Sequence, residues 1–147
     1  MNSVSDQNVR GTHGDASYQP GSFGTHRVTL AARHLHEPSG MFVRASGFVD
    51  RADNDYPMDD TPVADPRGRE VLARVYRFHD AYRAKGANVE TGFVDRPWAD
   101  RLLVRGFVTH DFKEIQHNLI MSRPYGDVSL EEAAAGGTLR YEHDFAQ

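Results

Sequence analysis

Histidines close to carboxylates are the side chains in this chain best suited to acid–base chemistry. His110 is followed directly by Asp111, and His117 lies a few residues further on. A histidine beside a carboxylate can accept and release a proton near neutral pH. His79 falls among apolar residues at helical spacing, so it is expected to face the sheet and to point into any cavity that the sheet encloses. We therefore name His79, His110, Asp111 and His117 as candidate catalytic residues; the alternatives are a hydrogen-bonded core histidine and a polar strand end.

Aromatic residues on the same expected surfaces are candidates for contacting a ligand. Phe78 and Tyr82 share the apolar side of the expected helix, and Tyr141 and His143 share one side of the expected last strand. The single tryptophan, Trp98, follows a proline in a turn, where it would serve as a lid or an oligomer contact; the alternative is that it folds back on the sheet. These five residues form the candidate ligand-binding set.

The pair His34 and His36 is a candidate metal site. Side chains two apart in a strand lie on the same face, so a third ligand from another strand would complete a zinc, iron or manganese centre. The alternative is an exposed strand end. The chain has no cysteine, which excludes thiolate ligands, thiol nucleophiles and disulfides. We expect no cofactor, with a histidine-held metal ion as the alternative.

Composition and missing motifs exclude several classes of function. The formal net charge of −4 gives no general attraction to nucleic acid. No apolar run reaches the roughly 20 residues needed to cross a bilayer, and the first residues do not form a signal peptide. We therefore expect no membrane partner and a cytoplasmic location. The sequence contains no phosphate-binding loop, dinucleotide fingerprint or nucleophile elbow, which counts against nucleotide enzymes and serine hydrolases.

The elements that would position these side chains are expected to be strands around one helix. Residues 1–25 are polar and aperiodic and predict a flexible N-terminal arm, followed by a single domain over residues 26–147. Asp65 and Pro66 favour the start of a long amphipathic helix, closed by Gly86. Residues 129–135 favour a short helix, and residues 112–122 are compatible with either helix or strand. The strands are expected at residues 28–35, 41–49, 89–94, 102–109 and 138–145, with a long loop over residues 50–66.

These expectations combine into an α+β fold. We expect a curved antiparallel sheet, shaped as a half-barrel or cone, packed against the long helix. The first functional hypothesis is a small-molecule-binding domain or a cofactor-independent isomerase, dehydratase or cyclase, with its site in a cavity between helix and sheet. The second is a non-enzymatic structural or assembly subunit of a larger homo-oligomer or complex.

Overall fold

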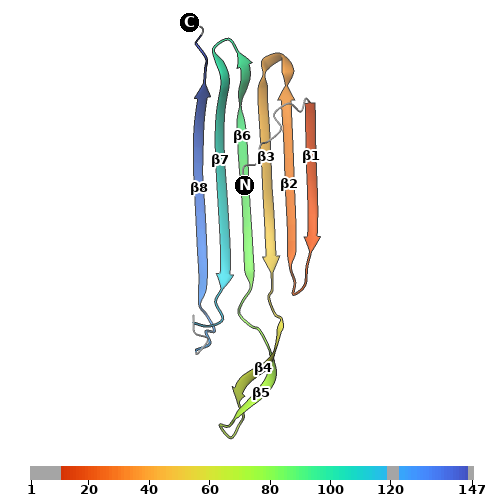
Figure 1. Cartoon of the computed structure of the whole chain (residues 1–147), viewed down its shortest axis with the longest axis vertical. Helices are drawn as coiled ribbons and strands as arrows, with labels where there is room; N and C mark the ends of the chain where they lie inside the picture. The colour runs from red at the N-terminus through yellow and green to blue at the C-terminus, as the bar shows by residue number, and fades with distance from the viewer. Residues whose placement is uncertain (1–10, 119–122, 146–147) are drawn as a thin grey trace.

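The computed structural model of the chain is a single-layered antiparallel sheet with a small separate hairpin, described for residues 11–118 and 123–145 (Figure 1). Six strands lie in the order β1-β2-β3-β6-β7-β8, and β4 pairs with β5 in the second sheet. The strands are β1 Gly11–Pro20, β2 His26–His36, β3 Met41–Ala52, β4 Pro57–Ala64, β5 Glu70–Tyr76, β6 Tyr82–Arg96, β7 Ala99–Glu114 and β8 Ser129–Glu142. Every pairing between neighbouring strands is antiparallel.

The predicted α+β fold is wrong, because the described residues contain no long helix. The only helical segment among them is the short 3-10 turn Glu37–Ser39. The residues assigned to the long helix instead form β5 and the first part of β6. The expected antiparallel pairing is confirmed, but no element of the described chain covers either face of the six-stranded sheet.

A tight turn replaces the expected start of the helix. Residues 65–69 connect β4 to β5. The first four, Asp65-Pro66-Arg67-Gly68, form the turn, in which the Gly68 N–H donates to the Asp65 carbonyl at 2.8 Å. Proline second and glycine fourth favour a type I turn as strongly as proline favours a first helical turn. Gly68 has a φ of 74°, which glycine adopts without strain. The glycine therefore decides between the two structures, and β-branched and aromatic residues after it continue as a strand.

Three further segments differ from the sequence expectation. The predicted short helix at residues 129–135 is wrong, because these residues begin β8 and pair with β7 along their whole length. Residues 11–20 of the expected flexible arm form β1, held by its ladder to β2. Residues 57–64 of the expected loop form β4. In each case pairing to a neighbouring strand outweighs local propensity. Of the ambiguous segment 112–122, β7 takes the part up to Glu114, and residues 119–122 lie outside the described residues.

The register divides the sheet into two chemically different faces. Residues two apart in a strand lie on one face, and directly opposite residues in paired strands share it. We call one side the apolar face; its large members include Val28, Leu30, Val43, Val49, Val89, Val104, Val108 and Leu139. We call the other the polar face; its polar members include Asp15, Arg27, Arg44, Ser46, Asp50, Asn88, Glu90 and Arg105.

The described residues form almost no hydrophobic core. Only Phe42, Ala84, Ala99 and Leu103 are buried apolar residues there, and no large side chain is completely buried. The chain exposes 11074 Å² of surface, whereas a compact monomer of its 16.5 kDa mass is expected to expose about 7,500 Å². The single layer leaves large apolar side chains in contact with solvent.

Candidate functional site

The apolar face is the most unusual surface of the molecule. Leu30 on β2, Val108 on β7 and Leu139 on β8 are 58%, 54% and 70% exposed. A typical monomer has no contiguous apolar patch larger than roughly 300–600 Å². Six strands at a spacing of about 4.8 Å and some ten residues long at about 3.4 Å each give the whole face roughly 800 Å². This area includes the polar side chains His34, Lys85, Thr91 and His110. Surfaces of this size and composition mark interaction sites.

A hollow lies in the half of this face that is nearer to the β4–β5 hairpin. It has a volume of about 360 Å³ and lies between Leu30, Val49 and Val108, over the small residues Gly47 and Ala87. Small residues surrounded by larger apolar ones leave room for a side chain of a partner surface. Lys85 and His110 also line the hollow, at its edge nearest the hairpin.

The polar face is organised by ion pairs and hydrogen bonds between directly opposite residues. Arg27 on β2 pairs with Asp50 on β3, and Arg44 on β3 pairs with Glu90 on β6 at 3.0 Å. The hydrogen bond and charge of Asp50 raise the pKa of Arg27 above its ordinary value. Cross-strand pairs of this kind stabilise a sheet and fix its register.

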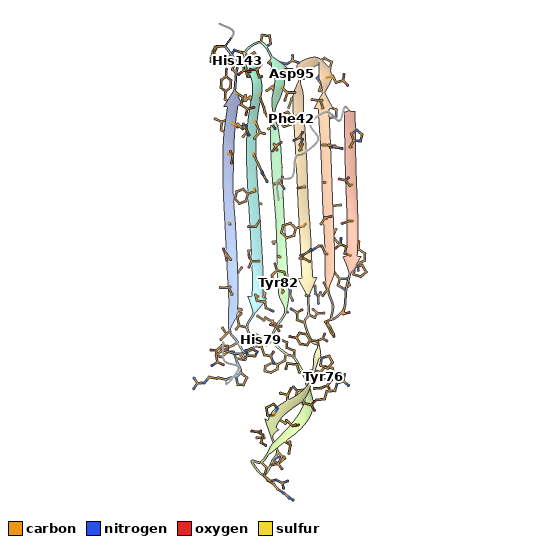
Figure 2. The ribbon with its side chains drawn as sticks, viewed as in Figure 1. Phe42, Tyr76, His79, Tyr82, Asp95 and His143 are labelled. Atoms are coloured by element: carbon orange, nitrogen blue, oxygen red, sulfur yellow. The ribbon has the colours of Figure 1, made fainter. Side chains whose placement is uncertain are left out.

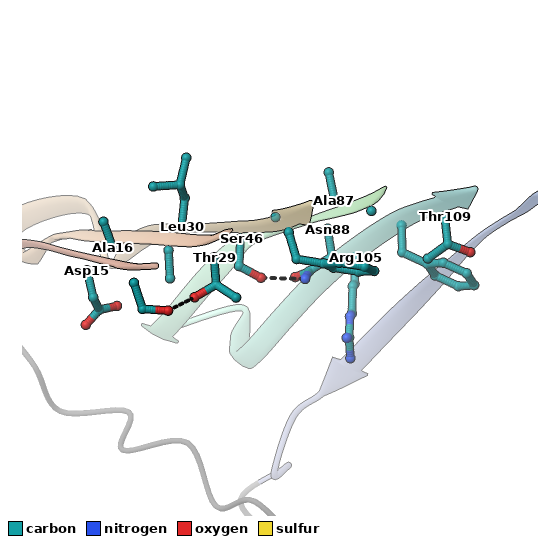
Figure 3. A pocket seen from close by; sticks show the side chains of 15 residues that line it. Asp15, Ala16, Thr29, Leu30, Ser46, Ala87, Asn88, Arg105 and Thr109 are labelled. Atoms are coloured by element: carbon teal, nitrogen blue, oxygen red, sulfur yellow. Dashed lines mark hydrogen bonds between the residues drawn. The ribbon is translucent and has the colours of Figure 1, made fainter. Parts of the chain in front are cut away.

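An open groove of about 570 Å³ crosses the middle of the polar face. Figure 3 shows Ser46, Asn88 and Arg105 on the opposite side of the ribbon from Leu30 and Ala87. Asn88 donates a hydrogen bond to Ser46 at 2.6 Å inside the groove. The groove is also lined by the exposed rings of Phe48 and Phe107, so this face combines paired polar groups with aromatic surface.

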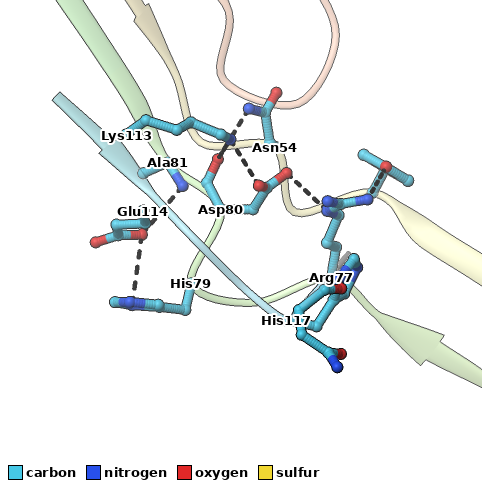
Figure 4. A network of polar contacts seen from close by, with 10 residues as sticks. Asn54, Arg77, His79, Asp80, Ala81, Lys113, Glu114 and His117 are labelled. Atoms are coloured by element: carbon cyan, nitrogen blue, oxygen red, sulfur yellow. Dashed lines mark hydrogen bonds and ion pairs between the residues drawn. The ribbon is translucent and has the colours of Figure 1, made fainter. Parts of the chain in front are cut away.

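A second polar arrangement lies at the end of the sheet that carries the hairpin, and we call it the Asp80 cluster (Figure 4). Asp80 is 7% exposed. Lys113 Nζ lies 2.6 Å from Asp80 Oδ1, and Arg77 Nε lies 2.6 Å from Asp80 Oδ2 in ion-pair contact, without the alignment of a hydrogen bond. Asn54 donates to the Asp80 carbonyl at 2.9 Å. The cluster therefore ties both connections to the hairpin to the end of β7.

His79 and Glu114 stand beside this cluster. His79 Nε2 donates to the Val128 carbonyl at 2.8 Å, and its Nδ1 lies 3.8 Å from Glu114 Oε2. The same Glu114 oxygen accepts the Ala81 N–H at 3.0 Å. These contacts join the start of β6, the end of β7 and the segment before β8, which is a structural role for both residues.

The candidate site residues are divided between the two ends of the sheet (Figure 2). His79 and Tyr82 lie at the end with the hairpin, whereas His143 lies at the opposite end. The eleven register steps from the pair Met41–Phe93 to the pair Ala52–Tyr82 correspond to about 37 Å at 3.4 Å per residue. The structure therefore brings together two subsets, and no single cavity contains the whole predicted set.

The His110–Asp111 pair is separated by the pleat of β7. His110 lies on the apolar face, where its Nε2 is 2.7 Å from Glu131 Oε1, whereas Asp111 points to the polar face. Neighbouring residues of a strand point to opposite sides, so these two cannot act on one substrate atom. His117 follows β7, and its Nδ1 donates to the Asn118 carbonyl at 2.9 Å.

Aromatic residues gather at the end of the sheet away from the hairpin. Trp98, in the β6–β7 turn, packs edge-on against Phe93 with ring centroids 5.7 Å apart. Tyr141 donates to the Trp98 carbonyl at 2.6 Å, and His143 Nδ1 lies 3.5 Å from Asp100 Oδ2. These contacts fasten the end of β8 to the turn.

Phe78 is exposed in the connection between β5 and β6.

The predicted metal pair occupies one face of β2, as its spacing implies. His34 Nδ1 lies 2.7 Å from the Thr12 hydroxyl, and His36 Nδ1 lies 2.7 Å from the Ser39 hydroxyl. Within residues 11–118 and 123–145, no group of three or more histidine and carboxylate side chains is arranged to hold a metal ion.

Sequence reasoning missed the apolar face, although its signal was present. In β6, Ala87, Val89 and Phe93 alternate with Asn88 and Glu90. A period-two pattern was recognised for shorter segments, but its continuation through 15 residues of β6 and 16 of β7 was not. Recognising that length indicates long paired strands with one apolar side.

Comparisons with known proteins give no further information on function. No helix in the described residues is long and apolar enough to span a membrane. No protein-family model, curated protein or solved structure matches the chain.

Proposed function

We propose that the protein is a non-enzymatic assembly subunit of a homo-oligomer, in which the apolar face of the sheet is buried against another copy of the chain. The observation that supports this proposal is the uncovered apolar face itself. Leu30, Val49 and Val108 are all more than half exposed, in a chain whose described residues bury only four apolar residues.

The size of the face suits a stable interface between two copies. Two faces of roughly 800 Å² each would bury roughly 1,600 Å² together, which is the usual size of a specific protein–protein interface. At about 25 cal/mol per Å² of apolar surface, such burial is a major stabilising contribution for a small protein. The apolar face would then become the core that a single copy lacks.

A second copy is favoured over an unrelated partner, because whatever covers the apolar face has to be present whenever the chain is folded. A sheet with both faces in solvent has little to offset the entropy lost on folding. A copy of the same chain is always available when this chain is made, and symmetric homo-oligomers are the commonest soluble assemblies. A cytoplasmic location stays a proposal from the sequence.

The enzyme hypothesis stays a prediction from the sequence, and its expected site has no counterpart in the described residues. The cavity was expected between the sheet and the long helix, and the helix is absent. The candidate catalytic residues His110 and Asp111 point to opposite faces of β7. Nothing in the geometry favours acid–base chemistry over a structural role for these residues.

The test compares two neighbouring alanines of β2 that lie on opposite faces. Ala32 lies on the apolar face opposite Ala45, and Ala31 lies on the polar face opposite Ser46. Ala32→Glu would place a charge in the buried interface, so we expect the oligomer mass measured by light scattering to fall, with at least a tenfold weaker association. Ala31→Lys is the control, because it places a charge on the polar face directly opposite Asp15; it should keep the mass of the unmodified protein.

If the polar-face variant dissociates as readily as the Ala32→Glu protein, the loss of association comes from the added charge alone. That result would overturn the proposal. An Ala32→Glu protein that keeps both its mass and its circular dichroism spectrum would also overturn it.

A further inference from the structure

Strand β8 is an open edge of the sheet. It is 14 residues long, contains no proline, and all its residues except Glu142 are exposed. One side of its backbone pairs with β7, and in the described residues no element pairs with the other side. An unpaired edge presents N–H and C=O groups that can form hydrogen bonds with another strand. Soluble proteins normally protect such edges from this pairing.

The residues of β8 are complementary to those of a second β8 running in the opposite direction. With a two-fold axis at Gly136, Glu132 stands opposite Arg140 of the other copy, and Ala134 opposite Thr138. The same register pairs Ala133 with Leu139 and keeps like faces together. Slipping by two residues in one direction places Glu132 opposite Glu142, and in the other direction opposite Thr138. Of these three registers, only the one centred at Gly136 forms the symmetric charge pairs.

Charges within one copy support this register. Asp111 on β7 stands directly opposite Glu132 on β8, and like charges in that position are destabilising. No described basic side chain lies within ion-pair distance of Glu132. Arg140, whose side chain is 61% exposed, pairs with Glu142 and still has donors to share. An Arg140 from a second copy would offset the repulsion at Glu132.

We infer that two copies of the chain join through their β8 strands, antiparallel and centred at Gly136, into one continuous twelve-stranded sheet. This inference rests on the proposed assembly function and names the second contact of that assembly. The axis leaves both apolar faces on the same side, so the joined sheet presents one wider apolar face. Packing two such sheets face to face gives four copies with closed symmetry.

The opposite edge of the sheet is less suited to this pairing. β1 is only ten residues long and ends at Pro20, which has no N–H to donate. Pairing of β8 with β1 of another copy would continue without closing unless the sheet curves into a ring. The two-fold β8 pairing closes on itself, which favours it.

Cysteine cross-linking tests the inferred register directly, because the natural chain has no cysteine. In the double variant Ala134→Cys/Thr138→Cys, each new thiol would lie directly opposite a thiol of the other copy. Opposite Cα atoms in an antiparallel pair are about 4.5–5.5 Å apart, within the range of a disulfide. We expect mild oxidation of the full-length protein to convert most of the chain to a covalent dimer on a non-reducing gel.

The single variants Ala134→Cys and Thr138→Cys are the matched controls. In the inferred register each single thiol lies about 14 Å along the strand from its own symmetry mate, too far for a disulfide. Neither should cross-link. Single variants that cross-link as well as the double variant would overturn the register.

The mass measured before oxidation separates failure of this inference from failure of the proposed function. An associated protein whose double variant does not cross-link would overturn the β8 pairing and leave the face-to-face assembly standing. A protein that is monomeric before oxidation would overturn both.

Discussion

At the scale of residues, the Asp80 carboxylate shows how this fold manages a buried charge. It is held between Lys113 and Arg77, whose side chains are 29% and 21% exposed. A nearly buried carboxylate persists only with cations and donors around it. Its partners come from the β5–β6 connection and from β7, so the cluster holds the hairpin end of the sheet together.

Removing the Asp80 carboxylate should therefore destabilise the protein. Asp80→Ala would leave two cations facing each other, and we expect the free energy of unfolding to fall by about 2–4 kcal/mol at a fixed protein concentration. Chemical denaturation monitored by circular dichroism measures this. Arg74→Ala is the control, because its ion pair with Asp59 is exposed on both sides and should cost less than about 1 kcal/mol. Equal effects of the two substitutions would contradict the structural role of the cluster.

At the scale of elements, the turn between β4 and β5 depends on one carboxylate. Asp65 accepts hydrogen bonds from the Arg69 backbone N–H at 2.9 Å, from the Arg69 guanidinium and from the Arg67 N–H. These bonds, the Arg69 backbone bond foremost, hold the pKa of Asp65 below its ordinary value. The stabilisation is complete above the pKa of an unfolded aspartate, about 3.9, and is lost as the pH falls through the lower folded-state pKa.

Acid should therefore weaken this turn as Asp65 is protonated. We expect the amide signals of Arg67 and Arg69 in NMR spectra to move together below about pH 4, as protonation of Asp65 breaks their bonds. Asp65→Asn should remove that transition, whereas Asp55→Asn, at an exposed position of the β3–β4 connection, should keep it. Amide signals that shift equally in the Asp65→Asn protein would contradict the assignment.

The elements that sequence reasoning could predict are those with period-two alternation, and the others depended on tertiary pairing. Strands around residues 28–35, 41–49, 89–94 and 102–109 were predicted and are confirmed, with longer bounds. The segment from Asp65 to Tyr82 carries both helix and turn signals, and only Gly68 separates them. Ala133, Ala134 and Ala135 favour a helix locally, yet β7 pairs with them as a strand. The site was harder to predict, because the predicted residues lie at both ends of strands whose length the sequence reading underestimated.

At the scale of the whole molecule, the described chain forms one layer, where a stable domain usually has two. Large aliphatic residues such as Val28, Leu30 and Leu139 lie on one side of a single layer. The ion pairs Arg27–Asp50 and Arg44–Glu90 lie on the other side, together with the aromatic rings of Phe48 and Phe107. Stable domains bury such a side against a second layer. The account therefore requires that folding and association occur together, as in obligate oligomers without a stable monomer.

The most direct test of this requirement is the mass of the unmodified protein in solution. Sedimentation equilibrium over a dilution series should give a multiple of the 16.5 kDa chain mass, four copies if both inferred contacts form. Circular dichroism should show loss of the strand signal at the concentrations where the mass falls. A protein that sediments as a single chain at every concentration and keeps its strand signal would contradict the account.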